Sequence, residues 1–113
     1  MKIGIVSDKT GLGIHTIRYY EKQGLVKQPS KDSSGHRVYS AKDVDLLNWI
    51  SCMKHSGMSL STIKQYTKAF YSNNSAACSL FLEEHLHHLL LQRDSIEHYI
   101  EVTENKIKNL KTS

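Results

Sequence analysis

The chain begins with two short stretches of helical hydrophobic spacing, each followed by glycine. Apolar residues recur at this spacing over Ile3–Thr10 and again over Ile14–Gln23, which predicts two short helices. Gly11 follows the first stretch and can adopt the left-handed conformation that ends a helix. Gly13 is a permitted cap for the second helix, and Gly24 follows its last turn. Two short helices joined in this way predict a helix-turn-helix.

The next segment has the pattern of a β-hairpin. Residues Val26–Tyr39 contain Pro29, Ser30 and the turn-forming Asp32–Gly35, followed by β-forming residues. We expect two short strands around a turn, which after a helix-turn-helix forms a β-wing. The combination indicates a sequence-specific DNA-binding protein.

Two further helices are predicted after the hairpin, each with its own cap. Ser40 and Asp43 have the spacing of a capping box at the start of a helix that Gly57 ends. Ser59 is then the expected cap of a helix over Leu60–Tyr71.

The last segment predicts one long helix over residues 76–111, which contain no Gly or Pro. Asn73-Asn74-Ser75 precedes it as a hinge in which Ser75 can cap the helix. Apolar residues recur in alternating steps of four and three, the 3.5-residue repeat of a coiled coil. Seven of the nine repeat positions are apolar; the positions are Leu82, Leu86, Leu89, Arg93, Ile96, Ile100, Thr103, Ile107 and Leu110. We expect this helix to pack on its copy in a homodimer; an intramolecular hairpin is the alternative.

These elements predict a mostly α fold. A winged helix-turn-helix DNA-binding domain with a small β-hairpin wing is expected over residues 1–72, a hinge over 73–75, and a coiled-coil dimerisation helix over 76–111.

Charge is distributed unevenly along the chain. Residues 1–68 hold 11 Lys and Arg against 5 Asp and Glu, a balance of +6, whereas residues 69–113 hold 4 against 6, a balance of −2. A basic front half fits DNA, and a mildly acidic rear half fits a protein partner. No apolar run approaches the roughly 18–20 residues that span a bilayer, and the start lacks a signal-peptide core. We therefore expect a soluble cytoplasmic protein without a membrane partner.

The sequence disfavours an enzyme, because it contains neither a Gly-rich phosphate loop nor a convincing catalytic triad. Its two cysteines are too few for a disulfide framework and are expected as free thiols. We expect no cofactor and assign no metal site. A competing function is an architectural or adaptor dimer that acts through its coiled coil.

The motifs of the front half together resemble the MerR family of bacterial transcription regulators. They are Thr10-Gly11-Leu12, Thr16–Glu21, Gly24-Leu25, Gly35–Tyr39, and Gly57-Met58-Ser59-Leu60 with Ile63-Lys64. The resemblance implies a dimer, joined through an antiparallel long helix, that binds a near-palindromic promoter operator. It also implies an activator that bends and untwists DNA so that RNA polymerase engages both promoter elements. A simple repressor is the alternative.

The resemblance makes the second helix the recognition helix, whose N-terminal residues lead into the major groove. We expect His15 and Thr16 to contact base edges. Arg18, Tyr19 and Lys22 are expected to reach phosphates or base edges along the groove. The opposite face of the same helix is expected in the core, at Ile14, Ile17 and Tyr20.

In the wing, we expect backbone contacts from Lys31, Ser34, Arg37 and Tyr39, because phosphate contacts fix the register on DNA. For Tyr39, a place in the core is the alternative. The chain departs from the usual family pattern at three positions. It has Gly13 in place of Ser, Lys31 in place of Arg, and His36 in place of Tyr.

Cys52 is the first candidate sensor. The segment Trp49–Gly57 resembles the subgroup of this family that responds to aldehydes and other electrophiles through a cysteine of the third helix. Cys52 lies off the apolar stripe of its helix, and Lys54 and His55 nearby favour a thiolate, although the helix C-terminus disfavours one. The alternative is a small buried hydrophobic side chain.

Other sensor sites stay open. Cys78 lies in the first turn of the long helix, where the dipole favours a thiolate, but the further cysteines of metal-sensing members are missing. It can alternatively form a reversible bridge with Cys52 of the partner subunit. His85 and His88 are one turn apart and suit zinc binding or acid sensing, although a solvated helix face is the commoner arrangement. Because the sequence ends after the coiled coil, we expect no large effector domain.

Overall fold

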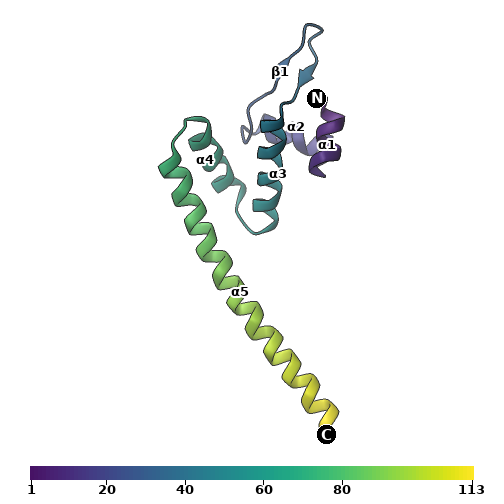
Figure 1. Ribbon diagram of the computed structural model, residues 1–113, viewed down its shortest axis with the longest axis vertical. Helices are drawn as coiled ribbons and strands as arrows, with labels where there is room; N and C mark the ends of the chain where they lie inside the picture. Colours follow the sequence, from purple (N-terminus) through teal and green to yellow (C-terminus); the bar gives the residue numbers. More distant parts are fainter. The chain divides into compact units, whose positions relative to one another are not determined.

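The structure, a computed structural model, describes all residues from 1 to 113. Its elements are α1 (Ile3–Thr10), α2 (Ile14–Lys22), β1 (Ser30–Lys31), β2 (Arg37–Val38), α3 (Ala41–His55), α4 (Leu60–Tyr71) and α5 (Ser75–Thr112), as Figure 1 shows. The predicted mostly α fold, with one small antiparallel hairpin and a long C-terminal helix, is confirmed. The chain forms two compact units, Met1–Cys78 and Ser79–Ser113, so the first turn of α5 belongs to the first unit.

The turn after α2 directs the chain from that helix into the hairpin. Gly24 has a φ of +77°, in the left-handed region that glycine adopts without steric cost. Its N–H donates to the carbonyl of Glu21 at 3.2 Å, and the N–H of Leu25 donates to the carbonyl of Tyr20 at 2.9 Å. These two bonds form a Schellman motif, which satisfies carbonyls that the end of a helix otherwise leaves free.

The caps of α3 and α4 are the residues predicted from the sequence, whereas the cap of α5 is a different residue. Ser40 and Asp43 form the predicted capping box, and the Ser59 side chain accepts from the N–H of Thr62. Ser75, the predicted cap of the long helix, is instead its first helical residue. The side chain of Asn74 takes the capping role and accepts a hydrogen bond from the N–H of Ala77 at 3.1 Å.

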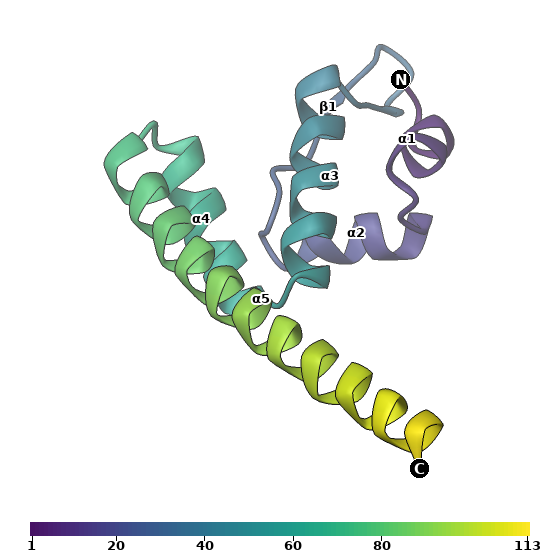
Figure 2. The ribbon, with the colours of Figure 1, turned by 60° about the horizontal axis from the view of Figure 1, so that its bottom comes forward.

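The core of the first unit is built by all four of its short helices. α1 contacts both α2 and α3, and α3 contacts α4, so these helices gather around α3 as Figure 2 shows. Fully buried apolar side chains come from each helix: Val6, Ile17, Tyr20, Leu47, Ile50 and Ile63. Ile14 departs from the prediction, because its side chain is 36% exposed rather than in the core.

Helix α5 is uninterrupted over 38 residues. Many of its apolar repeat positions are exposed in the single chain: Leu82, Leu86, Ile96, Ile100, Ile107 and Leu110. No helix in the structure combines the length and the apolar character that crossing a bilayer requires.

Candidate nucleic-acid interface

Helix α2 exposes one continuous polar face. Ile17 and Tyr20 are buried against the core, as predicted. The exposed side chains His15, Arg18, Tyr19 and Lys22 follow the spacing i, i+3, i+4 and i+7, which places them on one side of a helix. Thr16 is half-buried. The helix thus presents four of the five predicted contact residues in a single stripe.

The hairpin turn is held by Asp32, the first residue of the predicted turn. In the antiparallel register of β1 and β2, the backbone of Lys31 lies opposite that of Arg37. The Asp32 carboxylate accepts hydrogen bonds from the N–H groups of Ser34 and His36, each at 2.9 Å. Gly35 completes the turn at a φ of +81°. We call residues 30–38 the wing, and its exposed tip carries Lys31 and Ser34 as predicted.

Glu21 joins the wing to α2 and is a further residue that the sequence analysis did not single out. Its side chain is only 1% exposed and its Oε2 atom lies 3.2 Å from Nη1 of Arg37. This contact is an ion pair without the alignment of a hydrogen bond. The Tyr39 hydroxyl donates to the Oε1 atom of Glu21 at 2.5 Å. One buried carboxylate on α2 therefore binds two side chains at the end of the hairpin.

The prediction of Tyr39 as a phosphate contact is corrected by its position. Tyr39 is only 3% exposed, and its hydroxyl is already bound to Glu21. Burial, followed by the hydrogen bond to Glu21, raises the pKa of Tyr39 from 10.0 to about 12. The phenol therefore remains a neutral donor inside the protein. Tyr39 positions the wing and does not reach the surface that DNA would touch.

The start of the chain is fixed to the same hairpin. The amino group of Met1 donates to the carbonyl of Tyr39 at 2.7 Å, and the N–H of Tyr39 donates to the carbonyl of Met1 at 2.7 Å. This pair of bonds holds Lys2, the residue before α1, beside the wing.

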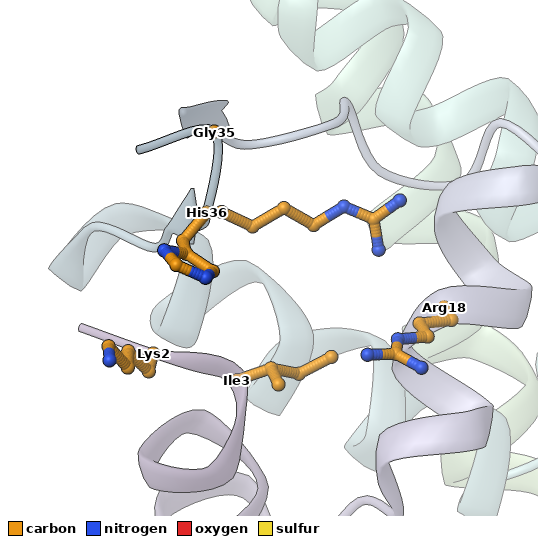
Figure 3. Close-up of a pocket in the computed structure, with 6 residues that line it drawn as sticks. Lys2, Ile3, Arg18, Gly35 and His36 are labelled. Carbon is orange, nitrogen blue, oxygen red and sulfur yellow. The ribbon is translucent and has the colours of Figure 1, made fainter. Parts of the chain in front are cut away.

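A hollow opens between the start of α1, the exposed face of α2 and the wing. Its volume is about 460 Å³. Figure 3 shows Lys2 and His36 on one side, Arg18 on the other, and Ile3 between them. The lining residues are Lys2, Ile3, Arg18, Gly35, His36 and Arg37, and we call this site the basic hollow. Lys2 was absent from the predicted contacts, and His36 was noted only as a departure from the family pattern.

The lining of the basic hollow suits an anion. It contains Lys2, Arg18 and Arg37, which are cationic at neutral pH, and no carboxylate. Arg37 is 35% exposed, so it pairs with Glu21 while part of its guanidinium still faces solvent. Arginine and lysine N–H groups form short, charge-assisted hydrogen bonds with phosphate oxygens. The arrangement can bind a phosphate of a nucleic-acid backbone.

Cys52 is exposed on α3, but the two basic side chains expected to activate it have other contacts. The Nδ1 atom of His55 lies 2.6 Å from the carbonyl oxygen of Ser51. The Nζ atom of Lys54 lies over the Tyr20 ring, 5.8 Å from its centre. The exposure of the thiol thus agrees with the prediction. The recorded contacts of His55 and Lys54, however, are with Ser51 and Tyr20 and not with Cys52.

Cys78 is half-buried where the start of α5 packs on α4. Its Sγ atom lies 4.0 Å from the carbonyl oxygen of Tyr66. Burial, and next the Coulombic interaction with Cys78, raise the pKa of Tyr66. On its other side Tyr66 stacks on Trp49 of α3, with ring centres 4.1 Å apart. Cys78 therefore borders the aromatic contact between α3 and α4.

The histidines of α5 do not form a metal-binding cluster in the single chain. His85 is buried, whereas His87 and His88 are exposed. No three His, Cys, Asp or Glu side chains converge in a way that would hold a metal ion.

A model of the MerR helix-turn-helix family of regulatory proteins matches residues 1–69, which include the helix-turn-helix, the wing and most of α4. The chain belongs to this family. An uncharacterised HTH-type transcriptional regulator of Haemophilus influenzae is 30% identical over 105 residues, which cover 93% of this chain and 64% of that protein. The chain spans about half the length of several other curated relatives.

Solved structures of MerR family members share the fold. A Listeria monocytogenes protein assigned to the MerR regulators superposes with a TM-score of 0.91 at 26% identity, covering all of this chain and 87% of that one. The structure of HiNmlR, a MerR family regulator that lacks the sensor domain and is bound to promoter DNA, has a TM-score of 0.83 at 25% identity. It covers 94% of this chain and 86% of the HiNmlR chain.

Proposed function

We propose that this MerR family member is a transcription regulator that binds double-stranded promoter DNA as a homodimer. The observation that carries the proposal is the basic hollow beside the exposed face of α2, because it combines a groove-reading helix with a phosphate-binding flank. The promoter DNA bound by the related HiNmlR supports the same assignment.

Within this proposal α2 enters the major groove. His15 and Thr16 at its start contact base edges, and Arg18, Tyr19 and Lys22 follow the groove wall. In the wing, Lys31, Ser34 and Arg37 contact the sugar-phosphate backbone. The ion pair of Arg37 with Glu21 holds the wing at a fixed position relative to α2, so both elements approach DNA as one unit.

The dimer forms through α5 in an antiparallel coiled coil. Its exposed apolar repeat, with Ile100 and Ile107 half-exposed in the single chain, supports this step because a second helix would remove that surface from water. Two DNA-binding units on one dimer require an operator with two related half-sites, which is the source of its near-palindromic sequence.

Activation proceeds by deformation of the DNA. The dimer bends and untwists a promoter whose two elements are poorly placed, and RNA polymerase then engages both elements. A repressor would instead exclude polymerase from the same DNA. The position of the operator within the promoter distinguishes the two modes.

The effector in our proposal is an aldehyde or another electrophile that reacts with Cys52. The thiolate sulfur adds to the carbonyl carbon of an aldehyde, the carbonyl oxygen takes up a proton, and the product is a hemithioacetal without any oxidant. Cys52 lies one helical turn from Trp49, whose ring stacks on Tyr66 of α4. An adduct at Cys52 would press on this stack and change the packing of α3 on α4. Exposure of the thiol supports this effector.

A soft-metal or other small-ligand effector at Cys78 is the second candidate. Its support is the position of that thiol next to the same aromatic stack, beside Tyr66. Variants of the two cysteines separate the candidates.

The proposed function is tested by selection from a library of random-sequence DNA duplexes. The purified chain is incubated with the library, and bound duplexes are amplified and sequenced. We expect enrichment of one near-palindromic motif, and no enrichment with Arg18→Ala. A motif that falls between the two promoter elements of its genes supports activation, and a motif over the transcription start supports repression. Equal recovery of all sequences contradicts the proposal.

A further inference from the structure

His36 is the one histidine among the lining residues of the basic hollow. Its side chain is 67% exposed at the wing tip. Its Nδ1 atom lies 3.8 Å from Oδ1 of Asp32, the same oxygen that accepts the backbone N–H groups of Ser34 and His36. Asp32 thus lies beside the Nδ1 atom of the imidazole. The other ring nitrogen, Nε2, is the one that can donate to a ligand.

Charged groups line the hollow around His36 from each neighbouring element. Lys2 comes from the start of α1, Arg18 from α2 and Arg37 from the wing itself. Asp32 is the acidic neighbour within the wing, and the carboxylate of Glu21 lies beyond Arg37. The amino group of Met1 is bonded to the carbonyl of Tyr39 at the end of the hairpin. Around the hollow, the cationic groups therefore outnumber the carboxylates of Asp32 and Glu21.

An anion in this hollow interacts differently with the two forms of histidine. A neutral imidazole donates from one nitrogen and carries no charge, whereas the imidazolium donates from both nitrogens. Histidine changes between these forms in the range of about pH 5 to 8. A phosphate oxygen beside the ring favours the charged form, so phosphate binding and proton uptake are linked and each strengthens the other.

We propose that His36 contacts a backbone phosphate of the bound DNA and makes the DNA affinity rise as the pH falls. The inference rests on the proposed DNA-binding function and adds a property that the other lining residues cannot supply. Lysine and arginine side chains in general are cationic throughout this range, so the contribution of the other basic lining residues does not vary with pH. His36 adds one further cation per protomer only in its protonated form.

The test uses the duplex enriched in the selection, labelled with a fluorophore and titrated by fluorescence anisotropy. For the wild-type chain we expect affinity on the order of tenfold higher at about pH 5.5 than at about pH 8. The logarithmic dependence of affinity on salt should steepen by about 0.9 for each protomer as the new phosphate contact forms. His36→Gln removes the charge but keeps a donor, so its affinity should show no increase between about pH 8 and about pH 5.5.

Two other histidine variants assign the effect to this residue. His98→Gln, on α5 in the second compact unit, should keep the full pH dependence. His15→Gln on α2 should weaken binding yet keep most of the increase at low pH. Circular dichroism at both pH values checks that each variant is folded.

The outcomes separate this inference from the proposed function. Sequence-selective binding with the same pH dependence in the wild-type chain and His36→Gln overturns the role of His36 alone. Loss of the pH dependence in His15→Gln rather than His36→Gln also overturns it. Absence of selective binding at any pH overturns the inference together with the proposed function.

Discussion

The hydroxyl of Tyr39 donates a 2.5 Å hydrogen bond to the buried carboxylate of Glu21, and this bond ties the end of the hairpin to α2. Arg37 pairs with the second oxygen of the same carboxylate from the wing. The two elements proposed to contact DNA are thus joined inside the protein before any ligand is bound. Such a link reduces the conformational freedom that DNA binding would otherwise have to remove.

Replacing Tyr39 with Phe tests this link through the pH dependence of stability. The pKa of Tyr39 is raised from 10.0 to about 12, first by burial and then by Glu21, so the folded state retains the phenol proton more strongly than the unfolded state. Its stabilising contribution is complete below pH 10 and is lost as the pH rises through about 12. In urea unfolding at neutral pH, Tyr39→Phe should be less stable by about 1–3 kcal/mol.

The same variant should lose less stability than the wild type between pH 10 and 12, because it lacks the raised pKa. Tyr19→Phe is the matched control, because Tyr19 is exposed. This change should leave the stability at neutral pH and the loss of stability at alkaline pH near the wild-type values. Identical alkaline stability profiles for Tyr39→Phe and the wild type would show that the phenol is not held by Glu21.

A double-mutant cycle measures the ion pair between Glu21 and Arg37. We expect Glu21→Gln and Arg37→Gln each to destabilise the chain. The double variant should lose less free energy of unfolding than the sum of the two single losses. The expected coupling free energy is about 1 kcal/mol, because Arg37 is partly solvated and water screens the pair. Urea unfolding of the four proteins supplies the values. Strictly additive losses would mean that the two side chains do not interact.

A charge in the apolar repeat of α5 should abolish dimer formation. Ile100→Glu would place a carboxylate in the proposed interface, where its desolvation opposes association. Sedimentation equilibrium should therefore give a dimer for the wild type and a monomer for this variant. Asn105→Glu adds the same charge at a polar position outside the repeat and should remain a dimer. If Ile100→Glu and Asn105→Glu are both dimers, this face of α5 is not the interface.

Cys52→Ser should retain DNA binding and lose the response to electrophiles. Transcription in vitro from a promoter carrying the selected operator is measured with and without formaldehyde or methylglyoxal. The wild type and Cys78→Ser should both respond, because only the exposed Cys52 is proposed to form the adduct. Loss of the response in Cys78→Ser alone would assign the sensor to that thiol. A full response in both variants would exclude a thiol sensor.

Local patterns were sufficient to predict most elements of the fold. Gly24 and Gly57 follow helix ends in the left-handed conformation, and the Ser40 capping box is present where its spacing indicated. These features depend on a few neighbouring residues, which is why the sequence alone predicts them. Part of the candidate DNA interface was also predictable, because helical periodicity alone places Arg18 and Lys22 on the same face of α2.

The remaining features depend on contacts between residues far apart in the sequence. Nothing near Tyr39 indicates that its hydroxyl reaches Glu21, 18 residues earlier. Lys2 joins the basic hollow only because Met1 pairs with the hairpin end, 38 residues later. The cap of α5 was assigned to Ser75 instead of Asn74 because adjacent residues have similar capping preferences, and the turn geometry decides between them.

The most direct test of the central claim, that α2 and the wing bind DNA, is the affinity of Arg18→Ala for the selected duplex at several salt concentrations. Arg18 is exposed, so the variant should keep the thermal stability of the wild type. We predict at least about tenfold weaker binding and a shallower salt dependence, by about 0.9 for each protomer, with Lys106→Ala on α5 unchanged. An Arg18→Ala protein that binds the duplex with wild-type affinity and salt dependence would contradict the account.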